Sequence, residues 1–233
     1  MQEIITLALG GVNCYLIKNK GNYLLIDTGG HMFLDKQYDN RSTLLEKKLR
    51  EYGVNASNCK GIILTHGDND HACNAKRIAK LLHSKIIMHR DDVWMVNHPS
   101  SSCYKVNNNY KSIILKIVFC IMSSKIQKLM DKVYDDFETF EPDVILEADT
   151  DMEVFGFDGM IYSVPGHTKG SICILDEKGN LICGDMFTNN GKPSIAINAE
   201  DFTVLKESAK KILSKSVKMV FPGHGDVFRS DEL

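Results

Sequence analysis

Short apolar runs bounded by polar turn residues recur along the chain and predict β-strands. Two longer segments each read as a pair of strands around a Gly-Asn turn, which is typical of a hairpin: residues 14–27 and 171–185. Single apolar runs predict three more strands, at residues 61–65, 85–89 and 218–224. Apolar positions at helical spacing predict two helices, at residues 71–83 and 204–216. This mixture of strands and helices indicates an α/β protein.

The two halves of the chain align at one constant offset. Lys20-Gly21-Asn22 lies 158 positions before Lys178-Gly179-Asn180. Asp27 precedes Asp185, and His66 precedes His224, by the same 158 positions. Three matches in one register predict a duplicated half-domain, with two facing mixed β-sheets and helices outside. Strands of both halves would then end at a common edge, where a site would lie.

Residues 91–142 break this symmetry. The stretch contains the single tryptophan, Trp94, a polar segment with Tyr104 and Tyr110, and an apolar helical pattern from Ile113 to Val133. We interpret it as a predominantly helical insertion, with the role of a lid, in one domain that spans residues 1–233. A helical excursion that only packs on the core is the alternative, and the sequence leaves both open.

Composition excludes several classes of protein. Hydrophobic residues make up 43% and charged residues 25%, as in an ordinary globular domain, and the net charge of -2 provides no global field for nucleic acid or membranes. The apolar run at residues 112–122 is too short to span a bilayer, so no stable membrane insertion is expected. Seven cysteines without a CxxC pair, and no basic leader, favour reduced buried thiols and a cytoplasmic location. The oligomeric state stays open.

Histidine and aspartate side chains follow the apolar strands at turns. Four of them fall within residues 66–71, and the others come directly after Gly166, Gly184 and Gly223. Imidazole nitrogens and carboxylate oxygens bind divalent transition metals, and two cations need more ligands than one short loop provides. Taken singly, each has an ordinary structural role; Asp70, for example, suits a helix N-cap. Together they favour a two-cation centre with the candidate ligands His66, Asp68, Asp70, His71, His167, Asp185 and His224.

The chain resembles the metallo-β-lactamase superfamily over nearly its whole length. The matching motifs are Leu25-Ile26-Asp27-Thr28-Gly29, the cluster at 66–71, Pro165-Gly166-His167-Thr168, Gly184-Asp185 and Pro222-Gly223-His224-Gly225. The resemblance implies an αββα sandwich and a dinuclear site. In that site His66, position 68 and His167 would hold one metal, Asp70, His71 and His224 the other, and Asp185 would bridge them. The resemblance also implies that Asp27 supports the ligand loop rather than binding metal.

Asp68 departs from the family pattern, because most members carry a histidine at this position. With three carboxylates and a bridging hydroxide, two divalent cations form a formally neutral centre, which acidifies water less and favours harder cations. Zinc is the first expectation for the two ions, and Asp68 makes manganese or iron plausible. The flavodiiron branch of the same superfamily carries a glutamate here, so a carboxylate is compatible with a dinuclear site.

The resemblance implies a hydrolase. A metal-bridging hydroxide would attack an ester, thioester, lactone or related small-molecule substrate, as in the glyoxalase II-like branch, and Asp70 would be the catalytic residue that orients it. Two alternatives stay open: a di-iron reductase of oxygen or nitric oxide, suggested by Asp68, and a metal-binding module without catalysis. Candidate residues for the substrate pocket are Lys169, Trp94, Tyr104 and Tyr110.

Overall fold

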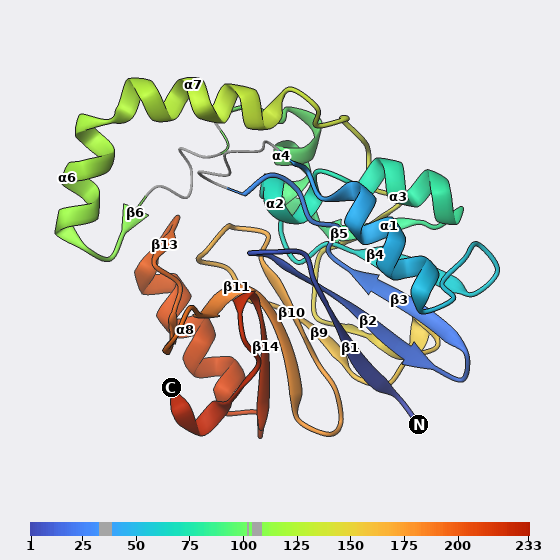
Figure 1. Cartoon of the computed structure of the whole chain (residues 1–233). Helices are drawn as coiled ribbons and strands as arrows, with labels where there is room; N and C mark the ends of the chain where they lie inside the picture. The colour runs from blue at the N-terminus through green and yellow to red at the C-terminus, as the bar shows by residue number, and fades with distance from the viewer. Residues whose placement is uncertain (33–38, 102, 104–108) are drawn as a thin grey trace.

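Two mixed β-sheets face each other in the computed structural model, which describes residues 1–32, 39–101, 103 and 109–233 (Figure 1). The first sheet has the order β1-β2-β3-β4-β5-β7. Its strands are Glu3–Ala8, Asn13–Asn19, Asn22–Ile26, Cys59–Ile63, Ile86–His89 and Val144–Leu146. The second sheet has the order β15-β14-β11-β10-β9-β8, with β12 beside β11. Its strands, in that order, are Phe228–Arg229, Met219–Gly225, Asn180–Asn189, Ile172–Leu175, Met160–Ser163 and Thr150–Asp151, with β12 at Pro193–Ile195.

The two sheets contain the same three-strand unit. In the first, β2 and β3 form an antiparallel hairpin, and β4 pairs parallel with β3. In the second, β10 and β11 form the hairpin, and β14 pairs parallel with β11. Gly21 and Gly179 turn the two hairpins with φ of 81° and 88°, a backbone region that favours glycine. The predicted duplication of a half-domain is therefore present in the topology.

Alternate strand residues divide the apolar core into layers. Leu24 and Ile26 of β3 pack between the sheets against Ile174 and Ile182 of the second half. Leu25, between them, points to the opposite face and joins the core under the helices. Helices α1 (Ser42–Glu51) and α3 (Ala75–Leu82) cover the first sheet, and α8 (Phe202–Leu213) covers the second (Figure 1). The expected αββα sandwich is confirmed.

One predicted helix is divided in the structure. The expectation of a single helix over residues 71–83 was wrong, because α2 (Asn69–Ala72) and α3 are separate elements. Asn74 lies at the break, and its buried side-chain amide donates hydrogen bonds to the carbonyls of Thr28 at 3.0 Å and Asn40 at 2.7 Å. These contacts tie the break to the loop after β3, which lies far away in the sequence.

The segment between β5 and β7 leaves the first sheet and projects from it. It contains η1 (Arg90–Asp92), α4 (Val93–Asn97), β6 (Asn109–Tyr110), α6 (Ile113–Ile121) and α7 (Ser123–Tyr134). Figure 1 shows α6 and α7 arching away from the sheets, and β6 pairs with β13 (Asn198–Ala199) of the second half. Val96, Phe137 and Phe140 are buried in the first core, so this segment is anchored at both of its ends. Among the described helices, none is long and apolar enough to cross a membrane.

Candidate metal centre

All seven sequence candidates for metal ligands lie together, at the edge where strands of both halves meet. His66 and its neighbours follow β4, His167 lies between β9 and β10, and Asp185 and His224 belong to β11 and β14. Their ligand atoms form three groups, and within each group all atoms lie within 4.8 Å of one another. The groups are His66, Asp68 and His167; Asp70, His71 and His224; and His66, His71 and Asp185.

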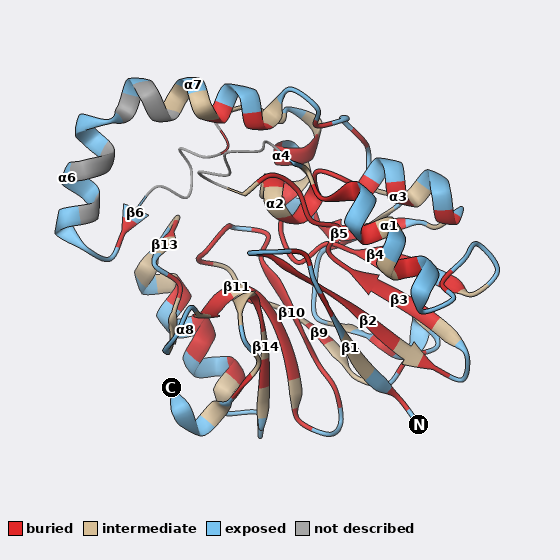
Figure 2. Ribbon diagram, in the orientation of Figure 1, coloured by how far each residue is buried: buried red, intermediate tan, exposed pale blue. Residues whose placement is uncertain are grey.

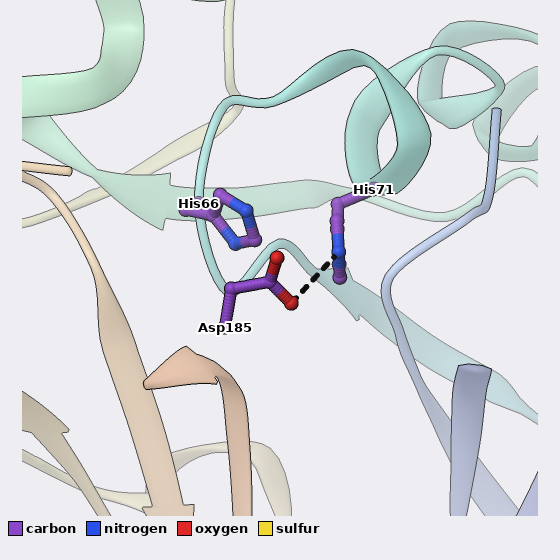
Figure 3. A group of neighbouring side chains, drawn as sticks. All are labelled: His66, His71 and Asp185. Carbon is purple, nitrogen blue, oxygen red and sulfur yellow. Dashed lines mark ion pairs between the residues drawn. The ribbon is translucent and has the colours of Figure 1, made fainter. Parts of the chain in front are cut away.

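The third group holds polar atoms that have no hydrogen-bond partner among the described residues. They are Nε2 of His66, Nε2 of His71 and Oδ1 of Asp185, all buried. Figure 3 shows the three side chains turned toward one another, with His71 Nε2 at 3.3 Å from Asp185 Oδ1. Buried polar atoms without partners are rare, because each loses its hydrogen bonds to water. A cation between them would satisfy two imidazole lone pairs and a carboxylate at once.

Backbone and carboxylate acceptors decide which nitrogen of each imidazole faces the centre. Nδ1 of His71 lies 2.8 Å from Asp27 Oδ2, Nδ1 of His167 3.1 Å from the Asn198 carbonyl, and Nδ1 of His224 2.7 Å from the Gly11 carbonyl. These oxygens only accept hydrogen bonds, so each Nδ1 carries the proton. In its neutral form each imidazole therefore has its lone pair on Nε2, as a metal ligand must.

Asp27 also fixes the tautomer of His66, through the side chain of Thr65. The Thr65 hydroxyl donates its one proton to Asp27 Oδ2 at 2.8 Å, and the Thr65 amide donates to Oδ1 at 2.7 Å. The hydroxyl must then accept at its 3.0 Å contact with Nδ1 of His66. His66 thus also carries its proton on Nδ1. A single buried carboxylate orients two imidazoles, and all four histidines offer Nε2 to the centre.

Imidazoles and carboxylates of the centre also pair with one another. Burial opposes ionisation of Asp68, but the hydrogen bond from His167 and the attraction of the His66 imidazole, 3.5 Å away, outweigh it and lower the pKa of Asp68. Burial likewise opposes protonation of His167, and the 3.1 Å bond to Asp68 is the main reason that its pKa is raised to about 9. The pKa of Asp185 is lowered against burial by the charges of His224 and His71. Divalent cations compete for these imidazoles with protons, so the donor set fits such ions.

Gly223 allows the ligands to approach this closely. A Cβ atom at this position would lie 2.3 Å from Asp185 Oδ1 and 2.6 Å from His71 Cε1. Both distances are far below van der Waals contact. The glycine before His224 is therefore required by the packing of two other candidate ligands.

Asp92 joins two ligand-bearing loops, and sequence reasoning missed it. This buried carboxylate accepts hydrogen bonds from the amides of Gly67 at 2.9 Å and Gly170 at 2.8 Å and from the Thr168 hydroxyl at 2.7 Å. Burial outweighs these bonds and raises the pKa of Asp92. It could have been recognised as an acidic residue just after β5, at the same sheet edge as His66. It was missed because residue 92 lies at the start of the segment that was assigned to the insertion.

The candidate pocket residues are placed differently from one another. The Lys169 side chain is 73% exposed and forms an ion pair with Glu200 at 3.1 Å. Trp94 is 48% exposed and its ring stacks on His98, whereas Tyr110 is buried in β6. Tyr104 lies outside the described residues. Tyr134 of α7 was not singled out from the sequence; burial, and then the negative charge of Asp68, raise its pKa.

Similarity to known proteins extends along the whole chain. The Bacillus subtilis protein named probable metallo-hydrolase YqjP is 22% identical over 247 residues, covering 96% of this chain and 70% of that one. The crystal structure of the BLEG-1 B3 metallo-beta-lactamase superposes with a TM-score of 0.68 and 18% identity, covering 99% of this chain and 95% of that one. TTHA1623 in a di-iron-bound form superposes with a TM-score of 0.61 and 20% identity, covering 97% and 94%. A sequence profile described as the metallo-beta-lactamase superfamily matches residues 7–224, and the chain therefore belongs to that superfamily.

Proposed function

We propose that the protein is a metal-dependent hydrolase of small ester, thioester or lactone substrates. The observation that carries the proposal is the set of four imidazoles whose Nε2 atoms are directed to one centre by acceptors at Nδ1. Membership of the superfamily and the metallo-hydrolase name of the Bacillus subtilis relative support it. Six buried free cysteines support a reducing, cytoplasmic location.

Two cations account best for the grouping of the side chains. His66, Asp68 and His167 would hold one ion, and Asp70, His71 and His224 the other. Asp185 would serve both, because its Oδ1 lies 3.3 Å from His71 Nε2 and its Oδ2 lies 3.8 Å from His167 Nε2. Zinc suits the imidazoles, and the carboxylate of Asp68 widens the choice to manganese or iron.

The bound cations would lower the pKa of water and polarise the scissile carbonyl. Asp70 is the carboxylate that we assign to proton uptake, because its side chain is 23% exposed, against 17% for Asp68 and 11% for Asp185. It lies 3.3 Å from His224, which holds it in place beside the centre. Asp27 and Asp92 would not touch substrate and would act by orienting the residues that do.

The insertion at residues 91–142 is well placed to serve as a lid. The side-chain amide of Asn69, which lies between Asp68 and Asp70, donates to the Val133 carbonyl of α7 at 3.0 Å. Elsewhere in the insertion, β6 pairs with β13, and the Asn198 carbonyl of β13 accepts a hydrogen bond from His167. The insertion thus contacts a direct neighbour of the candidate ligands in each half of the chain. Tyr110, Trp94 and Lys169 would line the approach for the substrate.

A di-iron oxidoreductase is the second candidate, favoured by one specific observation. Asp68 places a third carboxylate among the candidate ligands, and oxygen-rich ligand sets suit iron better than zinc. The structure of the neighbour TTHA1623 was solved in a di-iron-bound form, and this is a property of that protein. The two candidates differ in their reaction and in the metal that supports it: a hydrolase hydrolyses a substrate, whereas a di-iron oxidoreductase needs iron and reduces oxygen or nitric oxide.

The test is elemental analysis of the purified protein, followed by activity assays after reconstitution with zinc, manganese or iron. We expect about two ions per chain and hydrolysis of a member of an ester, thioester and lactone panel. His71→Ala should abolish both binding and hydrolysis, whereas His89→Ala, a buried histidine outside the centre, should retain both. Reconstituted protein without bound metal would refute the proposal. Oxygen consumption by the iron form, without hydrolysis, would favour the second candidate.

A further inference from the structure

Helix α6 presents an apolar face to solvent. Ile113, Ile114, Ile117 and Ile121 are 73%, 70%, 55% and 78% exposed. At about 100° per residue, these four side chains fall within an arc of roughly 100° on one side of the helix. Met122, directly after the helix, is also exposed. Figure 2 shows the described residues of α6 in the colour of exposed residues, on an element that projects from the sheets.

The sequence around this face is basic, although the whole chain has a net charge of -2. No acidic residue occurs between Asp92 and Asp131, and this stretch contains Lys105, Lys111, Lys116, Lys125 and Lys128. Lys111, Lys116 and Lys128 are exposed. Positive charge is therefore concentrated on the same segment as the exposed isoleucines.

The combination of charge and apolarity favours one occupant over another. A second copy of the chain, paired through α6 by a two-fold axis, would bring Lys116 near the same lysine of the other copy. An anionic lipid surface instead offers phosphate groups to the lysines and an apolar boundary to the isoleucines. Amphipathic helices with these two features lie in the plane of a membrane interface without crossing it.

The apolar face is joined to the candidate metal centre through β13. The Lys111 amide donates to the Ile197 carbonyl at 3.0 Å, and the Ile197 side chain is itself exposed. The next residue, Asn198, offers its carbonyl to Nδ1 of His167. A surface bound at α6 would therefore lie beside β13, the strand that orients His167.

We propose that α6 docks the protein reversibly on anionic lipid bilayers. The isoleucines enter the boundary between headgroups and acyl chains, and the lysines contact lipid phosphates. This inference is independent of the proposed hydrolysis, because it uses residues of the insertion and none of the candidate ligands.

The test is co-sedimentation of the full chain with vesicles of phosphatidylcholine alone and of an equal mixture with phosphatidylglycerol. We expect binding to the mixed vesicles, weakened by salt because surface charges are screened. The triple variant Ile113→Ser, Ile117→Ser, Ile121→Ser should bind at least about tenfold more weakly. Lys111→Gln with Lys116→Gln should weaken binding roughly 30-fold, as expected for two cations at an anionic bilayer. The control is Leu81→Ser with Val154→Ser, which removes exposed apolar side chains elsewhere.

Three results would overturn the proposal. The first is equal binding by the wild type and the triple variant, once circular dichroism shows that both are folded. The second is equal binding to neutral and anionic vesicles. The third is a wild-type dimer in light scattering that dissociates in the triple variant while no vesicles bind, which would assign the face to a second copy of the chain.

Discussion

Replacing Asp27 by asparagine changes one oxygen into an amide nitrogen and should disturb two imidazoles. Asp27 is 1% exposed and has a φ of 60°, a left-handed conformation that asparagine also tolerates. The Thr65 amide only donates, so the remaining oxygen of the introduced amide must stay at the Oδ1 position, 2.7 Å from it. The new NH2 group therefore replaces Oδ2, which now accepts from His71 and from the Thr65 hydroxyl.

This exchange reverses the direction of three hydrogen bonds, two of the introduced side chain and one between Thr65 and His66. The NH2 group donates to Nδ1 of His71, which moves the imidazole proton to Nε2. It also donates to the Thr65 hydroxyl, whose own proton then turns toward Nδ1 of His66, at 3.0 Å. Both imidazoles would present an N–H group instead of a lone pair to the centre. Neither can bind a cation in that tautomer.

The size of the effect follows from the number of histidines involved. Loss of one orienting partner of a metal-bound histidine costs about 10-fold to 100-fold in metal affinity. With two histidines affected, we expect a loss on the order of 100-fold to 10,000-fold, or about 3 to 5.5 kcal/mol. The fold itself should survive, because the substitution is isosteric and leaves the 2.7 Å bond to the Thr65 amide in place.

The assay is competition for zinc between the protein and a chelating dye, with the zinc content measured in parallel. Asp176→Asn is the matched control: Asp176 is also buried and accepts backbone hydrogen bonds, but in the turn between β10 and β11. It should leave zinc affinity unchanged. If Asp27→Asn binds zinc as tightly as the wild type while folded, the tautomer argument is wrong.

Further predictions concern Asp92, which joins two ligand-bearing loops, Asp68, the close-packed Gly223 and the metal-free protein. Asp92→Ala leaves two buried amides without acceptors and should lower the free energy of unfolding by about 2 to 5 kcal/mol in urea titrations; an unchanged midpoint would contradict this. Asp68→His adds a positive charge to the centre, so the acid limb of the pH–rate profile should move to lower pH with zinc retained; an unmoved profile at full occupancy would mean that Asp68 binds no metal. Gly223→Ala should reduce metal content sharply, because its Cβ would lie 2.3 Å from Asp185; normal stoichiometry by elemental analysis would refute that. After chelation, the stabilising His167–Asp68 pair is fully present below pH 6.5 and lost as pH rises through about 9, so thermal stability should fall across that range by circular dichroism, and a flat profile would count against the pair.

Local patterns predicted the two hairpins and strands β4, β5 and β14, because strand periodicity is a property of neighbouring residues, but they did not predict β1, β7 or β9. The expected hairpins at residues 14–27 and 171–185 correspond to β2-β3 and β10-β11. The helix expected at residues 204–216 is α8, which begins two residues earlier because Asp201 accepts from the amides of Thr203 and Val204 as its N-cap. Helix α1 was not predicted, although the buried Leu45 and Leu49 lie at helical spacing.

Where the sequence expectation failed, a distant contact decided the structure. The break between α2 and α3 depends on Asn74, whose side-chain amide donates to the carbonyls of Thr28 and Asn40, both between β3 and α1 in the sequence. Asp92 was assigned to the insertion because its stretch lacks the repeat of the two halves. Its three donors come from two other loops that the fold brings to it.

The sequence by itself determined the types and order of the candidate ligands, because histidine and aspartate carry their chemistry in the side chain and the turns that hold them are local. Tertiary structure alone decided which nitrogen of His167 and His224 faces the centre, because their partners are backbone carbonyls of Asn198 and Gly11. Every residue has a backbone carbonyl, so the residue type in the sequence does not reveal which carbonyl will accept from a histidine. Only the packing of the two half-domains places one opposite each Nδ1, and with it the lone pairs that a metal requires.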